Sequence, residues 1–375
     1  MAIIIINATA ARTSGALTVL RECILYIELC PVADNEYHLF TVVDEFDSSN
    51  KIKIHKIKRQ NWLSRIWWDG GGLWKWCRKR HLKPDIIISL QNTSTMYEGQ
   101  NGVKIIQLVY YHQSIPLYPW NELEYNLETG FYYFFYPFFV NRNTEQSHYV
   151  VQLPYMKKMF CSKFKNISPE RVTVIRTNRP QIDVNVILKK KISMIRGIFN
   201  FFYPAASLSY KNHKVIVSAL VILRKTHPEI FEKTKVFFTV DKLPNYLMKK
   251  IALNNLDICI QFIGQLPYAE ILSYYKSTDA LLFPSKMESL GYPLLEASCF
   301  GLPIIACDLP YAKEVLEDYK NKYFVTPDDA MAWADAICSY KNYAKITPDN
   351  ESLPKNSWKN FFELADSLVL GQKYG

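Results

Sequence analysis

The N-terminal half of the chain repeats a pattern of short apolar runs separated by stretches with helical periodicity. Ile3–Ile6 is a fully apolar, β-branched run, and the residues from about Ala16 to Cys30 are apolar at helical spacing. Such a run is typical of a parallel strand that is buried on both faces. Further strands are predicted at His38–Val43, Asp85–Ser89, Lys104–Val109, Tyr149–Leu153 and Val172–Ile175. Strands that alternate with helices predict a parallel sheet covered by helices.

The same pattern restarts near residue 199. Phe199–Tyr203 is predicted as a strand and Asn212–Thr226 as a helix, and the later strands are predicted at Lys235–Val240, Ile258–Ile263, Ala280–Pro284 and Pro303–Ala306. Pro180–Arg196 has no clear period and contains three consecutive lysines, so it is predicted to be a linker.

The fold class is therefore α/β, with two Rossmann-like domains. The predicted boundaries are 1–185 for an N-terminal domain and 186–355 for a C-terminal domain. Residues 356–375 are predicted to be a C-terminal helix that packs back toward the N-terminal domain.

Composition and charge narrow the class of protein. The chain has 375 residues, of which 49% are hydrophobic and 21% charged, which suits a folded globular protein of two domains. Its net charge of +10 favours anionic partners, namely nucleic acid, acidic lipid headgroups or phosphate-bearing small molecules. The charge alone does not choose among them, and it also serves solubility.

Cysteine usage and the N-terminus bear on the compartment. The eight cysteines form no C-x-x-C pair and no zinc-finger spacing with histidine, so they are predicted to be reduced and structural. The N-terminus lacks a basic segment before its short apolar run, and no window of about 18 apolar residues is present. We therefore expect a cytoplasmic protein that is either soluble or bound peripherally at the inner face of the plasma membrane.

Residues 279–315 carry the strongest chemical signal. Ala280–Phe283 is a buried strand, Pro293 suits the first turn of a following helix, and Gly301 is a stop signal. Glu288 then lies in the loop at the carboxyl end of the strand, and Glu296 lies in the helix.

A helix N-terminus that follows a glycine loop is an anion-binding site. The backbone N–H groups of Leu290, Gly291 and Tyr292 are expected to bind a diphosphate there. Glu296 is placed to accept hydrogen bonds from a ribose diol, and Glu288 to reach the hydroxyl groups of a sugar beyond the phosphates. On spacing alone, the alternative is that Glu288 assists helix capping and Glu296 is solvated.

The spacing of the two glutamates resembles a known family. Glu288 and Glu296 are separated by seven residues, within the segment FPSKMESLGYPLLEASCFGLPIIACDLP. This segment resembles the retaining GT-B enzymes of glycosyltransferase family 4. The resemblance implies two Rossmann-like domains that face a central cleft, with 1–185 as the acceptor-side domain and 186–355 as the nucleotide-sugar-binding domain. It further implies sugar transfer from a UDP- or GDP-sugar with retention of anomeric configuration. It also implies Glu288 and His112 as catalytic residues that position the sugar.

Other segments resemble the same family. The stretch FYPAASLSYKNH is similar to its pyrophosphate-binding segment, and Lys211 is kept there although Ala206 replaces an Arg that many members carry. Gly15, at the entry to the first helix, corresponds to one glycine of a pair that often contacts the diphosphate. His112 follows a strand, as the family's sugar-phosphate histidine does, and Asn92 is its expected neighbour.

The sequence gives no reason to expect a metal or a cofactor. It contains no convincing D-x-D motif, since Asp44-Glu45 and Asp328-Asp329 are interpreted as loop acids. Helix N-termini and Lys211 would then neutralise the diphosphate in place of a divalent ion.

The acceptor is predicted from two aromatic segments. Residues 62–83 mix Trp with Arg and Lys, and Phe131–Val140 is almost entirely aromatic. Such mixtures suit an anionic membrane surface, although packing inside the N-terminal domain explains the aromatic residues equally well. Together with the resemblance to the family, such a membrane contact would favour a lipid-linked saccharide as the acceptor. The pathway would then be the synthesis of a bacterial surface polysaccharide resembling O-antigen or capsule.

Several alternatives stay open. One is a GT-B relative with phosphorylase-like or inverting chemistry. Another is a catalytically inactive or membrane-docking scaffold. A third is a basic nucleic-acid-binding protein, although no nucleic-acid motif is present and no such partner is expected.

Overall fold

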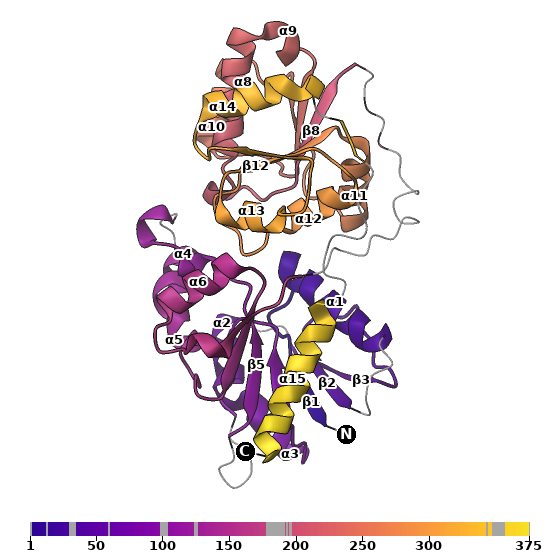
Figure 1. Cartoon of the computed structure of the whole chain (residues 1–375), viewed down its shortest axis with the longest axis vertical. Helices are drawn as coiled ribbons and strands as arrows, with labels where there is room; N and C mark the ends of the chain where they lie inside the picture. The colour runs from indigo at the N-terminus through magenta and orange to yellow at the C-terminus, as the bar shows by residue number, and fades with distance from the viewer. Residues whose placement is uncertain are drawn as a thin grey trace. The chain divides into compact units, whose positions relative to one another are not determined.

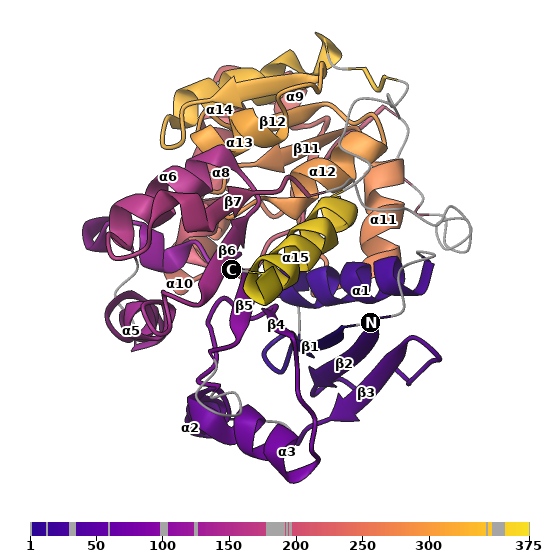
Figure 2. The ribbon, with the colours of Figure 1, turned by 60° about the horizontal axis from the view of Figure 1, so that its bottom comes forward.

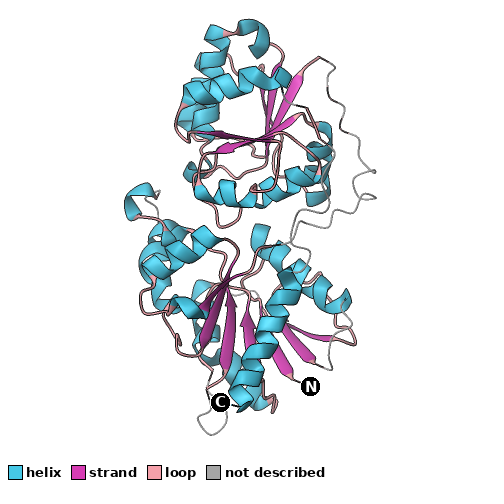
Figure 3. Cartoon of the chain, in the orientation of Figure 1, coloured by secondary structure: helices cyan, strands magenta, loops and turns pink. Residues whose placement is uncertain are grey.

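The protein consists of two α/β units. The computed structural model describes residues 2–12, 14–29, 35–58, 61–97, 104–123, 127–177, 192, 194, 197–342, 344–346 and 357–374. Unit 1 comprises Met1–Asn178 with Pro354–Gly375, and unit 2 comprises Arg179–Leu353. In each unit a sheet lies among helices (Figures 1 and 3), which confirms the predicted fold class of two Rossmann-like α/β domains. The predicted linker at 180–196 lies outside the described residues, except for Ile192 and Met194.

Unit 1 contains a seven-stranded, wholly parallel sheet in the order β3-β2-β1-β4-β5-β6-β7. The strands are β1 (Ile3–Asn7), β2 (Glu36–Thr41), β3 (Ile52–Lys56), β4 (Ile86–Ser89), β5 (Ile106–Tyr110), β6 (Ser147–Val151) and β7 (Val172–Val174). The order reverses direction between β1 and β4, which places a topological switch point there.

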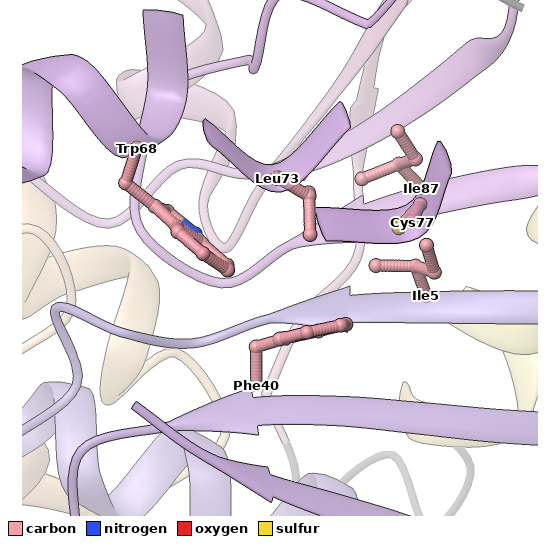
Figure 4. Close-up of a cluster of buried hydrophobic side chains, with 6 residues drawn as sticks. All are labelled: Ile5, Phe40, Trp68, Leu73, Cys77 and Ile87. Carbon is pink, nitrogen blue, oxygen red and sulfur yellow. The ribbon is translucent and has the colours of Figure 1, made fainter. Parts of the chain in front are cut away.

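Helices cover both faces of this sheet. One face carries α1 (Ser14–Leu29) and α15 (Ser357–Tyr374), which lie side by side in Figure 2 and meet where Phe362 stacks on Tyr26 at 5.3 Å. The other face carries α2 (Trp62–Trp67), the π-helical turn η1 (Trp68–Gly72) and α3 (Leu73–Lys79). Figure 4 shows the core beneath them, which contains Ile5, Phe40, Trp68, Leu73, Cys77 and Ile87.

Short helices and turns connect the later strands of unit 1. They are η3 (Ile115–Leu117), η4 (Trp120–Glu122), α4 (Leu127–Gly130), η5 (Phe131–Phe135), α5 (Tyr136–Val140), α6 (Pro154–Lys163) and η6 (Pro169–Arg171).

Unit 2 contains a six-stranded parallel sheet in the order β10-β9-β8-β11-β12-β13. The strands are β8 (Phe199–Tyr203), β9 (Thr234–Phe238), β10 (Ile260–Phe262), β11 (Ala280–Phe283), β12 (Ile304–Cys307) and β13 (Lys322–Val325). Neighbouring residues of β8 point to opposite faces, because Phe202 stacks on Tyr274 while Tyr203 packs on His213. The switch point lies between β8 and β11.

The helices of unit 2 alternate with its strands. They are η7 (Ser209–Lys211), α8 (His213–Thr226), α9 (Pro228–Phe231), α10 (Asn245–Leu253), α11 (Tyr268–Ser277), α12 (Tyr292–Cys299), α13 (Pro310–Val315), α14 (Ala330–Cys338) and η8 (Ser339–Asn342). The predicted start of α12 near Pro293 and its stop at Gly301 are confirmed. Gly301 has φ +66°, and a Cβ there would come within 1.8 Å of the Ile346 carbonyl oxygen.

Two strands escaped the pattern search, and both lie at sheet edges. The sequences of β3 (IKIHK) and β13 (KYFV) mix apolar residues with lysine, as edge strands do when one side faces solvent. A search for fully apolar runs finds central strands and passes over such edges.

The tryptophan-rich segment 62–83 divides between core and surface. Trp68 is 4% exposed, whereas Trp67 is 58% exposed. Trp76 packs edge-on against Phe40, and Arg80 lies 4.0 Å above its ring centroid. Packing therefore explains some of these aromatic residues, and others remain on the surface.

Candidate functional site

The candidate site in unit 2 lies at the carboxyl ends of β8 and β11. In open α/β sheets, ligands bind outside the carboxyl ends of the strands at the switch point. The loop after β8 runs from 204 to 212, and the loop after β11 from 284 to 291. The backbone N–H of Lys286 donates to the Tyr210 carbonyl at 2.7 Å and so ties the two loops together.

Lys211 and Glu288 form an ion pair across these two loops. The Lys211 Nζ lies 2.5 Å from Glu288 Oε1, and their side chains are only 18% and 13% exposed. Tyr203, at the end of β8, donates its hydroxyl to the Lys211 carbonyl at 2.5 Å and fixes the backbone that carries the lysine. Two opposite charges are therefore held together at the switch point with little access to water, which strengthens their interaction.

The N-terminus of α12 follows Glu288 after a short loop. Gly291 is the N-cap and has φ +81°, in the left-handed region that favours glycine. Leu290 is buried, and Tyr292 begins the helix. The first turn therefore points its backbone N–H groups toward the carboxyl edge of the sheet, as an anion site requires.

Glu296 lies inside α12 and is 7% exposed, so the alternative that it is solvated is wrong. Tyr275 of α11 donates its hydroxyl to Glu296 Oε2 at 2.8 Å. Burial raises the pKa of the Glu296 carboxyl, and hydrogen bonds from Tyr275 and Tyr268 act in the opposite direction. Glu288, for which helix capping was the alternative, forms an ion pair with Lys211.

A second polar cluster lies at the carboxyl edge of unit 1. The backbone N–H of His112, just after β5, donates to Asn92 Oδ1 at 2.5 Å. Its ring Nε2 lies 3.4 Å from the Leu90 carbonyl oxygen. Burial lowers the pKa of His112 to about 4, the Leu90 hydrogen bond opposes this, and nearby Arg65 adds to it. The ring is therefore neutral near pH 7.

The structure brings the predicted site residues together in two sets. Lys211, Glu288 and the start of α12 gather in unit 2, and His112 and Asn92 gather in unit 1. Gly15 lies in the first turn of α1, half-buried. Thr13, which precedes this turn, lies outside the described residues.

Sequence reasoning missed the residues that hold these side chains. Tyr275 was not singled out, because an aromatic residue at helical spacing looks like core. Gln91 and Asp69, which are buried in unit 1, were also missed. Gln91 directly follows a buried strand, which was a usable signal that this edge of the sheet carries polar chemistry.

The structure also bears on metals and membranes. Within the described ranges, no three His, Cys, Asp or Glu residues are placed to hold a metal ion. Among the same residues, none of the helices is both long and apolar enough to traverse a lipid bilayer.

Comparison with known proteins relates the sequence of this chain to a family of enzymes. Residues 190–349, which contain Lys211, Glu288 and Glu296, match the family described as Glycosyl transferases group 1. The chain is a glycosyltransferase. It is 24% identical over 266 residues to the O-antigen chain mannosyltransferase RfbU of Salmonella typhimurium. The match covers 66% of this chain and 71% of that protein.

Solved structures share the fold. WaaG, a glycosyltransferase involved in lipopolysaccharide biosynthesis, is 12% identical with a TM-score of 0.65, and the match covers 98% of each chain. HepE from Anabaena, solved in complex with UDP and glucose, is 14% identical with a TM-score of 0.62, over 99% of this chain and 97% of that one. These neighbours are GT-B glycosyltransferases, so this glycosyltransferase has the GT-B architecture.

Proposed function

We propose that the chain is a retaining family 4 glycosyltransferase that moves a sugar from a UDP- or GDP-sugar to a lipid-linked saccharide. Its product would be a bacterial surface polysaccharide of the O-antigen type. The observation that carries the proposal is the Lys211–Glu288 pair at the switch point of unit 2, inside the matched region 190–349. The O-antigen and lipopolysaccharide activities named for RfbU and WaaG support the choice of product.

The donor diphosphate would bind between Lys211 and the start of α12. As the bond from the anomeric carbon to the diphosphate oxygen breaks, negative charge grows on the leaving group. The Lys211 ammonium and the backbone N–H groups of Leu290, Gly291 and Tyr292 would stabilise that charge. These groups would neutralise the diphosphate in place of a divalent metal ion.

The remaining site residues would bind the rest of the donor. The Glu296 carboxylate, oriented by Tyr275, would accept hydrogen bonds from the ribose diol. Glu288 and the neutral His112 would position the transferred sugar. The acceptor hydroxyl would attack the face from which the diphosphate leaves, so anomeric configuration is retained.

Peripheral membrane association is part of the proposal. Three phenylalanines of η5 and α5 are solvent-exposed, and α2 adds two more large apolar side chains. Their exposed fractions are 60% for Phe134, 63% for Phe135, 69% for Phe138, 59% for Leu63 and 58% for Trp67. Together with the net charge of +10, these exposed side chains of unit 1 suit an anionic lipid interface that would present the acceptor.

Thermal shift in EDTA tests the donor site. UDP, GDP, ADP and their sugars would be added to the wild type, to Glu296→Gln, and to Glu232→Gln as an exposed control in the same unit. We expect one nucleotide family to raise Tm in the wild type and in the control, and the rise to be smaller in Glu296→Gln, which keeps only one of the two acceptor oxygens. No rise with any nucleotide, or an equal rise in Glu296→Gln, would contradict the assignment and favour the inactive scaffold.

Vesicle flotation tests the membrane surface separately. The double variant Phe135→Ser/Phe138→Ser should bind phosphatidylglycerol-containing vesicles at least roughly 10-fold more weakly, because each exposed Phe loses about 1.5–3 kcal/mol of apolar burial. Leu253→Ser, at an 84% exposed position in unit 2, is the matched control and should bind as the wild type does. Equal binding by all three proteins would refute peripheral attachment through this surface.

A further inference from the structure

A buried carboxylate, Asp69, lies in the π-helical turn η1 of unit 1 and is 6% exposed. Three glycines follow it. Gly71 has φ +132°, and a Cβ on Gly72 would come within 2.7 Å of the Trp67 ring. Side chains on either side of the glycines anchor the turn to the sheet through the core cluster in Figure 4. This turn therefore depends on glycine at 71 and 72, and it holds Asp69 in a fixed place.

Asp69 joins the two strands that flank the switch point of unit 1. Its Oδ1 accepts a hydrogen bond from Asn7 Nδ2, at the end of β1, at 3.2 Å. The same oxygen accepts a shorter one, 2.6 Å, from Gln91 Nε2, just beyond β4. A single carboxylate oxygen thus bridges the carboxyl ends of β1 and β4.

Gln91, in the loop after β4, is held by further hydrogen bonds. Its side-chain Oε1 accepts from the Thr9 hydroxyl at 3.1 Å and from the Ala10 N–H at 3.2 Å. Its backbone carbonyl accepts from Arg65 Nη2 at 3.1 Å and from the Tyr136 hydroxyl at 3.3 Å. Gln91 is therefore held by three separate segments of unit 1 as well as by Asp69.

The residues on either side of Gln91 are those that hold His112. The Leu90 carbonyl faces the His112 ring, and Asn92 accepts the His112 backbone N–H. Asn92 also has φ +68°, a conformation that costs free energy and must be held by its surroundings. Fixing Gln91 therefore fixes both groups that orient the imidazole.

The network is costly for stability, which argues against a purely structural role. Burial raises the pKa of Asp69 to about 6, and its nearest charge, Arg65 Nε, is 3.9 Å from Oδ2. Arg142 also faces Asp69 and weakly favours its charged form, whereas Tyr136 lies close enough for the two to interact electrostatically. An ionised carboxylate in such surroundings destabilises the fold near pH 7 relative to a well-packed neutral group.

We propose that Asp69 is a positioning residue for His112, acting through Gln91 on residues 90–92. Asp69 itself touches no substrate. This inference rests on the proposed role of His112 in positioning the transferred sugar. It adds that the accuracy of that position is set by the hydrogen bonds from Asn7 and Gln91 to one Asp69 oxygen.

Two variants separate hydrogen bonding from charge. Asp69→Leu removes the acceptor, whereas Asp69→Asn keeps one carbonyl oxygen that can accept both hydrogen bonds without the charge. We expect kcat for release of UDP or GDP from the sugar donor to fall about 10- to 100-fold in Asp69→Leu, since small misplacements are that damaging. In Asp69→Asn, kcat should stay within about threefold of the wild-type value, because the retained hydrogen bonds keep His112 in place.

A double-mutant cycle tests whether the effect runs through His112. In a His112→Ala background, Asp69→Leu should cause no further loss of kcat. Ser147→Ala, which removes a buried hydrogen bond to the Asn143 carbonyl in unit 1, is the control for lost stability and should leave kcat unchanged. Where His112→Ala itself lowers kcat, two results would overturn the proposal: an equal loss of kcat in Asp69→Leu with and without His112, or no loss of kcat in Asp69→Leu alone.

A second readout keeps this test separate from the proposed enzyme activity. The His112 ring is followed by NMR through a pH titration, and its pKa should move in Asp69→Leu and stay in place in Asp69→Asn. If His112→Ala has no effect on the rate, the proposed sugar-binding role has failed, and the NMR titration still decides the positioning role. If Asp69→Leu does not fold, Gln91→Met removes the same hydrogen bond from the other side, and an unmoved His112 titration there would also refute the inference.

Discussion

The two units share a sheet topology but place different chemistry at the same position. At the switch point of unit 2, Lys211 and Glu288 bring full charges to 2.5 Å of each other. At that of unit 1, the Asn92 amide oxygen accepts the backbone N–H of His112 and the Leu90 carbonyl faces its neutral ring, while the Asp69 carboxylate is buried in η1. The difference lies in the loops that follow the strands, because the strands themselves are similarly apolar.

The contrast fits a division of labour between the units. A leaving diphosphate is anionic, so it requires a cation and backbone N–H groups. A transferred sugar is neutral and rich in hydroxyl groups, so it requires well-oriented hydrogen-bonding partners. Under the proposed function, unit 2 binds the diphosphate through charge, and unit 1 orients the sugar through geometry.

The largest expected effect is a loss of stability that is confined to unit 1. Phe362 of α15 is 4% exposed and stacks on Tyr26. Phe362→Ala should lower the free energy of unfolding of unit 1 by about 3–5 kcal/mol, because a cavity is left in its core. Hydrogen exchange of peptides from each unit measures this loss of stability. In Phe362→Ala, bound nucleotide should still slow hydrogen exchange in unit 2. Leu370→Ala, at a 55% exposed position of the same helix, should change little.

The next effect concerns charge at the switch point of unit 2. Lys211→Met removes the cation proposed to meet the diphosphate and leaves Glu288 without its ion-pair partner. We expect kcat/KM for the nucleotide-sugar to fall roughly 10²- to 10³-fold, the usual loss when one stabilising donor is removed. Lys286→Met, at a 38% exposed lysine that pairs with Asp328, is the control. Equal losses in both variants would show that only general positive charge matters.

A buried histidine makes unit 2 sensitive to acid. His213 is 3% exposed, and burial lowers its pKa to about 3, so it is neutral in the folded state. Since the unfolded value is near 6.5, its stabilisation is complete above that pH and is lost as pH falls toward 3. At pH 5 the loss should be about 2 kcal/mol, seen in denaturant unfolding of the wild type.

Replacing the ring tests that sensitivity. His213→Phe, among aromatic neighbours, should lose less stability between pH 7 and pH 5. His227→Phe, whose side chain is 45% exposed in the wild type, should respond to pH as the wild type does. An unchanged pH response in His213→Phe would contradict the assignment.

The smallest effect concerns the N-cap of α12. Gly291→Ala and Gly197→Ala both place a side chain at positive φ, and each should cost about 1 kcal/mol of stability. Only Gly291 precedes the proposed anion site, so only its variant should weaken nucleoside diphosphate binding. Calorimetric titration distinguishes them, and equal affinities in both variants would remove α12 from the donor site.

The sequence was sufficient to predict the fold class, and it pointed to candidate site residues. Buried parallel strands are continuous apolar runs, so β1, β4, β8 and β11 stand out, and Pro293 with Gly301 marks the ends of α12. Glu288 and Glu296 were singled out by the resemblance to the family, because their spacing alone left helix capping and solvent exposure open. The edge strands β3 and β13 were missed because their patterns resemble those of exposed segments.

The interactions that orient the site could not be predicted. The Lys211–Glu288 pair joins residues 77 positions apart, and the Asp69–Gln91 hydrogen bond depends on a π-helical turn. Neither has a local sequence pattern, because each arises when two loops meet at the edge of a sheet. The burial of Glu296 against Tyr275 follows likewise from how α11 and α12 pack.

The most direct test of the division between the units is calorimetric titration in EDTA. The nucleoside diphosphate and its sugar would each be titrated into the wild type, Lys211→Met and His112→Ala. The account predicts that Lys211→Met weakens both ligands, whereas His112→Ala weakens only the nucleotide-sugar. If His112→Ala weakens the nucleoside diphosphate as much as Lys211→Met does, or if neither variant weakens either ligand, the account is contradicted.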